Sequence, residues 1–76
     1  SVGWVYFRLG RLNEAEDYLR RAYAIRPDAE IGVHLGEVLW VKGQRDEAAT
    51  FWRAAQQKDP TNETLKSTLT RLRVQL

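Results

Sequence analysis

The stretch LGEVLWVKGQRDEAATFWRAAQQKDPTNE, residues 35–63, repeats the pattern of residues 2–30 at an offset of 33 residues. Nine of the 29 aligned positions are identical, and five of the others pair apolar with apolar. The identical pairs are Gly3/Gly36, Val5/Val38, Gly10/Gly43, Glu14/Glu47, Ala15/Ala48, Arg20/Arg53, Ala22/Ala55, Pro27/Pro60 and Glu30/Glu63. A period in this range is typical of stacked supersecondary units, and such arrays usually bind other proteins.

Length and composition limit the chain to one small domain. It has 76 residues and no cysteine, so neither disulfides nor a cysteine-ligated metal stabilise it, and we expect no cofactor. Its 43% hydrophobic and 29% charged residues are ordinary for a soluble globular domain, and no stretch approaches the roughly 20 apolar residues of a membrane span. The chain starts in mid-pattern at Ser1 without an initiator methionine, so we interpret it as a piece of a longer protein.

The basic residues are spread along the chain. Nine Arg and three Lys against ten acids give a net charge of only +2. One mild bias exists, since Lys66, Arg71 and Arg73 follow the last acid, Glu63. Basic residues are favoured near a helix C-terminus, so this tail is interpreted as a solvated helix face. A nucleic-acid surface would need a basic stripe with interleaved aromatics, which the sequence lacks, and no nucleic-acid partner is expected.

Apolar residues recur at three- and four-residue spacings throughout, which predicts helices and no strand. Asn13 is a candidate N-cap with Glu16 as its capping-box partner, and Asp28 and Asp46 are placed to begin later helices. Gly43 is expected to end one helix, and Asp59–Asn62 to close another and cap the last. The predicted helices are five, at residues 2–9, 13–26, 29–42, 46–58 and 62–75. Short linkers make sequential neighbours antiparallel.

The small, apolar and turn-forming residues of both repeats resemble the pattern of the tetratricopeptide repeat family. The framework positions matched in residues 29–62 are Leu35, Gly36, Leu39, Gly43, Ala48, Trp52, Ala55 and Pro60. Residues 1–28 match the later part of another repeat through Val2, Gly3, Tyr6, Gly10, Ala15, Leu19, Ala22 and Pro27. The resemblance implies an all-α helix-pair solenoid forming a single domain over 1–76. It divides into a partial repeat (1–28), a full repeat (29–62) and a capping helix (63–76).

Two departures from the family pattern stand in this chain. Gly32 occupies a position where the family often has Trp, which leaves less bulk inside that helix pair. The spacing is 33 residues instead of the usual 34. More loosely, residues 3–10 and 34–40 are similar to the C-terminal end of large bacterial repeat proteins. Several of those are periplasmic lipoproteins acting as scaffolds, so this likeness implies a Gram-negative periplasm and a lipoprotein parent.

Catalysis is not expected. Nucleophilic mechanisms need a Ser, Cys or Thr beside a base and an orienting group, and the chain has one His, no Cys and only two serines. Glu30, His34 and Glu37 share one helix face and could in principle ligate a divalent metal. They lack a fourth ligand nearby, so a polar rim is the preferred interpretation, and no metal site is assigned.

The aromatic residues indicate a binding groove. The resemblance places the first helix of each pair on the concave surface, where a peptide or partner domain would bind. The candidate binding residues are Trp4, Phe7, Arg8, Glu30, Val33, His34, Glu37, Trp40, Val41 and Arg71. Alternatively, Trp40 and Phe7 merely seal the seam between repeats. A clamp for a C-terminal carboxylate is not expected. Repeats that form one place Lys and Asn on the groove, whereas Val33 and Glu37 stand at the matching positions here, and Glu37 would repel the carboxylate.

The sequence therefore predicts a non-enzymatic interaction scaffold. The alternative is a purely structural end-cap of a larger array. Loss of an upstream repeat would expose Val2, Val5 and Phe7, so we also expect either modest stability as a monomer or self-association through the first helix.

Overall fold

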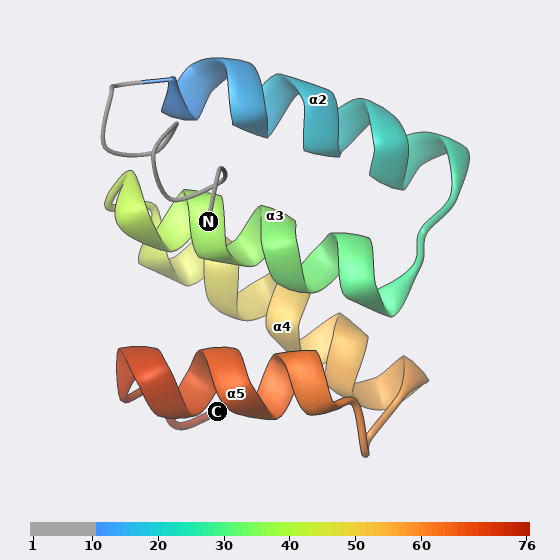
Figure 1. Ribbon diagram of the computed structural model, residues 1–76, viewed down its shortest axis with the longest axis vertical. Helices are drawn as coiled ribbons and strands as arrows, with labels where there is room; N and C mark the ends of the chain where they lie inside the picture. The colour runs from blue at the N-terminus through green and yellow to red at the C-terminus, as the bar shows by residue number, and fades with distance from the viewer. Residues whose placement is uncertain (1–10) are drawn as a thin grey trace.

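The computed structural model describes residues 11–76. This part of the chain consists of helices joined by turns and irregular segments, with no strand. Its helices are α2 (Leu12–Ile25), α3 (Ala29–Val41), α4 (Arg45–Lys58) and α5 (Glu63–Leu72). Each runs antiparallel to the one before it (Figure 1). The all-α prediction is confirmed. Four helices are supported instead of five, because the helix predicted at 2–9 lies outside the described residues.

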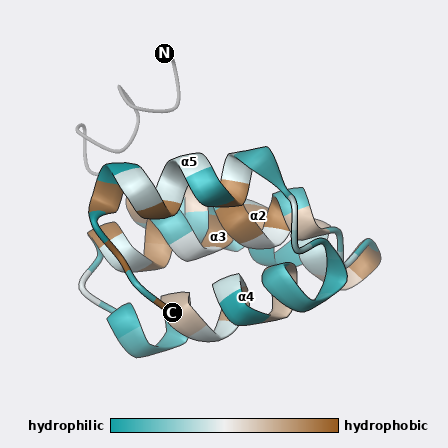
Figure 2. Ribbon diagram, turned by 90° about the horizontal axis from the view of Figure 1, so that it is seen from below, coloured by the Kyte–Doolittle hydropathy of each residue, from teal (hydrophilic) through white to brown (hydrophobic). Residues whose placement is uncertain are grey.

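Helix α3 is the centre of the described structure. It packs against α2, α4 and α5, and the hydrophobic parts of α3 and α5 lie towards the middle of the molecule (Figure 2). The fully buried apolar side chains come mainly from α3 and α4, with one from α5. They are Val33, Leu35, Val38, Leu39, Ala48, Trp52, Ala55 and Leu65. The core therefore lies between α3, α4 and α5.

A glycine–tryptophan contact fixes how closely α3 and α4 approach. Trp52 is 0% exposed, and its Nε1–H donates to the Val33 carbonyl oxygen at 3.2 Å. A Cβ atom on Gly36 would lie 2.5 Å from Trp52 Nε1. Only glycine therefore leaves room for the indole at this crossing. The small residues Ala48 and Ala55, also buried, complete the same interface.

The absence of a bulky residue at position 32 is compensated from α2. Tyr23 places its ring beside Gly32, where an added Cβ would lie 3.2 Å from Tyr23 Cε1. The same ring meets Phe51 of α4 edge-on, with centroids 5.3 Å apart. The aromatic volume that the family usually supplies from α3 itself thus comes from the preceding helix.

Two of the predicted helix starts are confirmed and two are wrong. Asp28 Oδ1 accepts the Glu30 amide at 2.8 Å, and Asn62 Oδ1 accepts the Leu65 amide at 2.9 Å. Asn13, in contrast, lies inside α2, which begins one residue earlier without a side-chain cap. Asp46 likewise lies inside α4.

Two helix ends, those of α3 and α5, are set by left-handed residues. Gly43 ends α3 as predicted, with φ of 92°, and the Gln44 amide donates back to the Leu39 carbonyl at 2.8 Å. Helix α5 ends at Leu72, three residues earlier than predicted. Arg73 takes φ 58° there, and the Val74 amide donates to the Leu69 carbonyl at 2.9 Å. This Schellman motif returns Val74 to the core, where it is half-buried.

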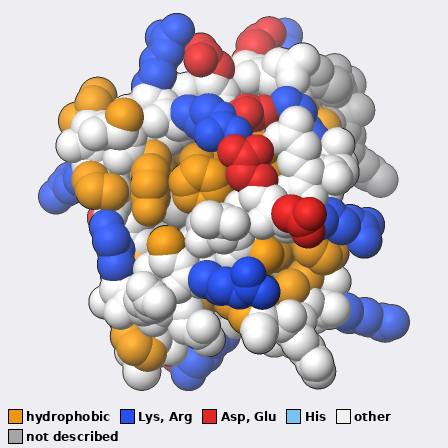
Figure 3. Space-filling model, turned by 180° about the vertical axis from the view of Figure 1, so that it is seen from behind, with side chains coloured by type: hydrophobic (Ala, Val, Ile, Leu, Met, Phe, Trp, Pro, Cys, Tyr) orange, Lys and Arg blue, Asp and Glu red, His pale blue; other side chains and the backbone are white. Residues whose placement is uncertain are grey.

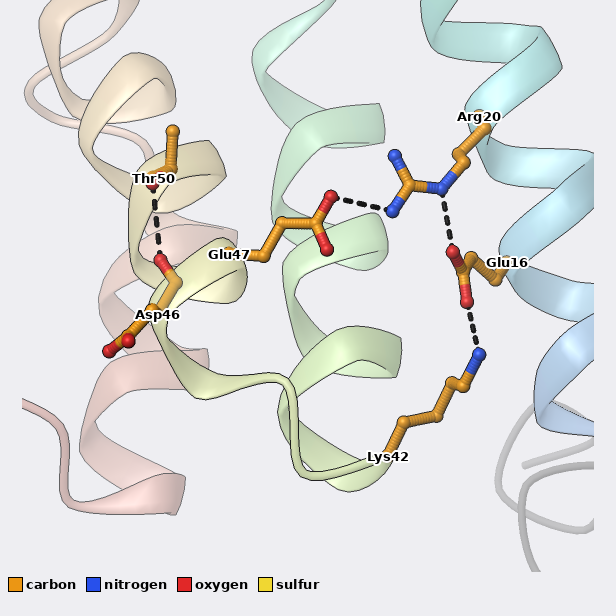
Figure 4. Close-up of polar contacts among 6 residues, drawn as sticks. All are labelled: Glu16, Arg20, Lys42, Asp46, Glu47 and Thr50. Carbon is orange, nitrogen blue, oxygen red and sulfur yellow. Dashed lines mark hydrogen bonds and ion pairs between the residues drawn. The ribbon is translucent and has the colours of Figure 1, made fainter.

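An ionic cluster joins α2 to the α3–α4 turn (Figure 4). Glu16 accepts from Lys42 and, at 2.6 Å, from Arg20 Nε, while Arg20 Nη2 donates to Glu47 at 2.7 Å. The hydrogen bonds from Lys42 and Arg20 lower the pKa of Glu16. Those to Glu47 and Glu16 raise the pKa of Arg20. Since the Glu16 and Lys42 side chains are only 16% and 19% exposed, salt screens their pair less than a surface pair. The cluster explains why Glu16 is not the capping-box partner that its spacing predicted.

Candidate protein-interaction surface

One row of the central helix stays open while most of that helix is buried. We call Glu30, His34, Glu37 and Val41 the α3 row, because their spacings of four, three and four residues place them on one face. The Glu30 and His34 side chains are 49% and 54% exposed, and Val41 is 41% exposed. Glu30, His34 and Val41 of the α3 row are therefore the residues of α3 that a partner can reach.

The N-terminal end of the α3 row is polar. Glu30 lies in the first helical turn, where the helix dipole favours a carboxylate. His34 Nε2 stands 3.7 Å from Glu30 Oε2, one turn further along. Within residues 11–76 no group of three or more His, Cys, Asp or Glu side chains is arranged to hold a metal ion. The exposed pair can instead donate and accept hydrogen bonds from a peptide backbone or side chain.

The middle of the row is an ion pair between α3 and α5. Glu37 is 7% exposed, and its Oε2 lies 3.1 Å from Arg71 Nη1. The positive charge of Arg71 offsets the negative charge of Glu37. The repulsion that the sequence predicts between Glu37 and a peptide C-terminus is therefore weakened. Glu37 and Arg71 therefore join α3 to α5 at the edge of the α3 row.

Trp40 packs inward, towards α4. Its ring lies 5.5 Å from that of Trp52, and the Arg45 guanidinium stacks over it at 4.4 Å from the ring centroid. The indole is half-buried against the core. This arrangement favours a sealing role for Trp40 over that of an open binding anchor. The sequence analysis did not identify Arg45. The only feature that could have indicated it is its position five residues after Trp40.

Val33 was expected on the groove and is in the core. It is 0% exposed and packs in the same cluster as Leu35 and Trp52. Its placement is wrong because α2, α4 and α5 all pack against α3, so little of that helix stays open. Trp4, Phe7 and Arg8 lie outside the described residues.

The opposite face of the molecule, over α4, carries mixed charge. Basic and acidic side chains adjoin one another there, with apolar patches between them (Figure 3). The ionic cluster of Glu16, Arg20, Lys42 and Glu47 likewise joins groups of opposite sign. A surface of interspersed sign does not offer the continuous positive stripe that a nucleic acid requires.

Within residues 11–76, the α3–α4 pair with its glycine–tryptophan crossing and its turn at Gly43 has the form of one helix-pair repeat unit. Residues 1–29 match the family model described as "Tetratricopeptide repeat". This segment is therefore similar to a tetratricopeptide repeat. Repeats of this family are typically non-catalytic and take protein partners.

A bacterial relative shares part of the sequence. Over 37 residues the chain is 51% identical to the TPR repeat-containing protein PA4667 of Pseudomonas aeruginosa. The aligned segment covers 49% of this chain and 6% of that protein, so the chain spans a small part of its relative's length. No solved structure matches the chain. None of the helices in residues 11–76 is both long and apolar enough to cross a membrane.

Proposed function

We propose that the chain is a non-enzymatic interaction module that binds a peptide or partner domain across the α3 row. The observation that carries the proposal is the contrast within α3. Seven of its thirteen residues are buried, whereas Glu30, His34 and Val41 stand exposed on one face. A central helix that keeps one mixed polar and apolar row accessible is suited to receive a partner segment.

The fixed surroundings of the row support binding with little reorganisation. The Glu37–Arg71 pair holds α5 beside the row, and the buried Trp52 holds α4 behind it. A surface held on rigid helices loses little conformational entropy when a ligand binds. Trp4, Phe7 and Arg8 remain part of the proposal, as the residues by which the resemblance extends the groove along the array.

Peptide selection tests the proposal. A random peptide library displayed on phage is selected against the 76-residue chain, and the enriched peptide is titrated by calorimetry into the chain and two variants. We expect His34→Ala or Val41→Asp to weaken binding about ten-fold or more, as loss of a central contact of at least about 1.4 kcal/mol would do. The control, Gln57→Ala on the exposed side of α4, leaves the affinity unchanged. Enriched peptides that bind all three proteins equally would place the site elsewhere.

The second candidate function is a structural end-cap, and α5 carries the observation in its favour. Its inner residues Leu65 and Thr68 are buried, whereas Lys66, Ser67 and Arg71 lie on its exposed side. A terminal helix with a polar outer face protects the end of a repeat stack from solvent. In this function partners bind other repeats, and the peptide selection yields no specific binder. The accompanying self-association through the first helix concerns residues outside the described part.

A further inference from the structure

The α3 row carries one exposed charge that its neighbours leave unbalanced. Of its two acids, Glu37 is 7% exposed and has Arg71 Nη1 3.1 Å from its Oε2. The Glu30 side chain is 49% exposed, and its ion-pair partner within residues 11–76 is His34, which is charged only when protonated. The N-terminal end of the row is therefore complementary to a positively charged side chain of a partner.

Two further charged groups lie near this end, and neither neutralises Glu30. Asp28, the N-cap of α3, accepts the Glu30 amide at 2.8 Å and adds negative charge beside it. Lys58 donates to the Pro27 carbonyl and lies 6.0 Å from the centroid of the Tyr23 ring, so its ammonium is held between α4 and α2. The negative character of the end is thus a property of the folded chain.

The C-terminal end of the row is apolar and has basic neighbours. Val41 is 41% exposed and follows the half-buried Trp40, over whose ring the Arg45 guanidinium lies at 4.4 Å. Lys42, at the same turn between α3 and α4, donates to Glu16. A partner's basic side chain would meet like charge here, whereas an apolar side chain would cover Val41.

We infer that the α3 row recognises an extended segment of a partner protein in which a Lys or Arg stands about five residues from a large apolar side chain. The inference rests on the proposed function of this row. Glu30 and Val41 are eleven residues apart on one helix, which is about 16 Å at 1.5 Å per residue. An extended chain rises about 3.3 Å per residue and covers that distance in about five residues.

The width and polarity of the row favour an extended segment over a helix. Val33 and Val38, on either side of the row, are both 0% exposed, so the open strip is narrow. His34 on α3 and the exposed Ser67 of α5, one turn before Arg71, offer hydrogen-bonding groups along it. The backbone of an extended segment can bond to these groups, whereas the backbone of a helix is already paired within itself.

A charge swap tests the inference. The peptide selection is repeated on the variant Glu30→Lys, and the peptides from both selections are titrated into both proteins. Glu63→Lys is the matched control, because Glu63 is the counterpart of Glu30 in the 33-residue repeat, is exposed in the first turn of α5 and lies outside the α3 row. Glu30→Gln removes the charge without reversing it. Circular dichroism and urea unfolding establish that each variant folds as the parent does.

We expect the parent and Glu63→Lys to select a Lys or Arg about five residues from an apolar residue, and Glu30→Lys to select Asp or Glu in place of the base. Peptides selected on the parent should bind Glu30→Gln about two- to five-fold more weakly and Glu30→Lys more weakly still. Added salt should narrow these differences, because Glu30 is half-exposed.

Three other outcomes would overturn the inference. Peptides that lose affinity with His34→Ala and Val41→Asp but bind Glu30→Lys as well as the parent would leave the proposed function standing without a basic partner. A base about eleven residues from the apolar residue would assign the row to a helix. A selection without any peptide that depends on the row would overturn the proposed function and the inference together.

Discussion

Gly36 shows how a single missing side chain decides the packing of a helix pair. Its Cβ position is occupied by the Trp52 indole, with Nε1, Cδ1 and Cε2 at 2.5, 2.8 and 2.9 Å. Trp52 is fully buried and tied to the Val33 carbonyl, so it cannot move aside. We expect Gly36→Ala to lower the free energy of unfolding by about 1–3 kcal/mol.

Gly32→Ala is the matched control, on the same helix and one turn away. The nearest atom there is Cε1 of the half-buried Tyr23 ring, at 3.2 Å, and alanine favours helix over glycine by about 1 kcal/mol. We expect this variant to be as stable as the parent or slightly more stable. Urea unfolding of both variants measures the difference. A Gly36→Ala chain no less stable than Gly32→Ala would contradict the assigned crossing.

At the scale of an element, α5 ends in a strained residue. Arg73 adopts left-handed φ and ψ of 58° and 47°, which cost an L-residue with a Cβ roughly 1–2 kcal/mol. Glycine adopts them freely but loses more entropy on folding. We therefore expect Arg73→Gly to stabilise the chain by up to about 1 kcal/mol in thermal unfolding. Arg73→Lys keeps both the Cβ and the charge and should change nothing, so equal stability of the two variants would count against a strained cap.

The N-cap of the same helix gives the opposite prediction. Asn62 is 8% exposed, accepts the Leu65 amide and donates from Nδ2 to Asp59 at 3.2 Å. Asn62→Ala should cost about 1 kcal/mol, measured by urea unfolding, because the Leu65 amide loses its partner. Asn13→Ala is the control, since the Asn13 side chain lies within α2 and makes no cap. A loss as large for Asn13 would reinstate it as the start of α2.

The sequence predicted elements better than their ends. Spacing located four helices to within a few residues, because apolar periodicity reports the face that a helix buries. Asp28 and Asn62 were identified as caps from residue type alone. Asn13 and Asp46 have the same chemistry but lie within helices, and the end at Arg73 required a left-handed arginine, a residue for which composition gives no signal. Val33 was misplaced because helical spacing cannot tell how many neighbours cover a helix.

For the molecule as a whole, the ionic cluster makes stability depend on pH. The pKa of Glu16 is lowered in the folded chain from an ordinary value of 4.5, because its ionised form is hydrogen-bonded by Lys42 and Arg20. A depressed carboxyl pKa contributes stability that is complete above about pH 4.5 and is lost as the pH falls towards the lowered value. We expect Glu16→Gln to cost about 1 kcal/mol at pH 7 and progressively less below pH 4.5.

Urea unfolding at a series of pH values from neutral to acid measures this difference. Asp17→Asn serves as the comparison, because the Asp17–Arg21 pair is 63% and 78% exposed and joins no two helices. It should show little change at any of these pH values. A cost of Glu16→Gln that stays constant across the acid range would mean that the carboxylate charge is not what the folded chain uses.

The sequence predicted which helix carries the candidate surface, but it did not predict which side chains pair with one another there. Glu30, His34 and Val41 were placed on an accessible surface by the family resemblance, and they are exposed. The pairing of Glu37 with Arg71 joins residues 34 positions apart, which no local pattern relates. The Arg20–Glu47 pair did leave a signal, since both residues recur at the 33-residue offset, as Arg53 and Glu14.

The rest of that cluster does not recur. Where the offset would repeat Glu16 and Lys42, the chain has Ala49 and Leu9. Tandem repeats lengthen and shorten by recombination between similar copies, and a crossover here would separate Glu16 from Lys42 while leaving the helical framework in register. The charges between α2 and the Gly43 turn thus distinguish this junction from one built on the equivalent positions of the other repeat. Neighbouring units are similar in shape, but exchanging their order would lose this charge pair.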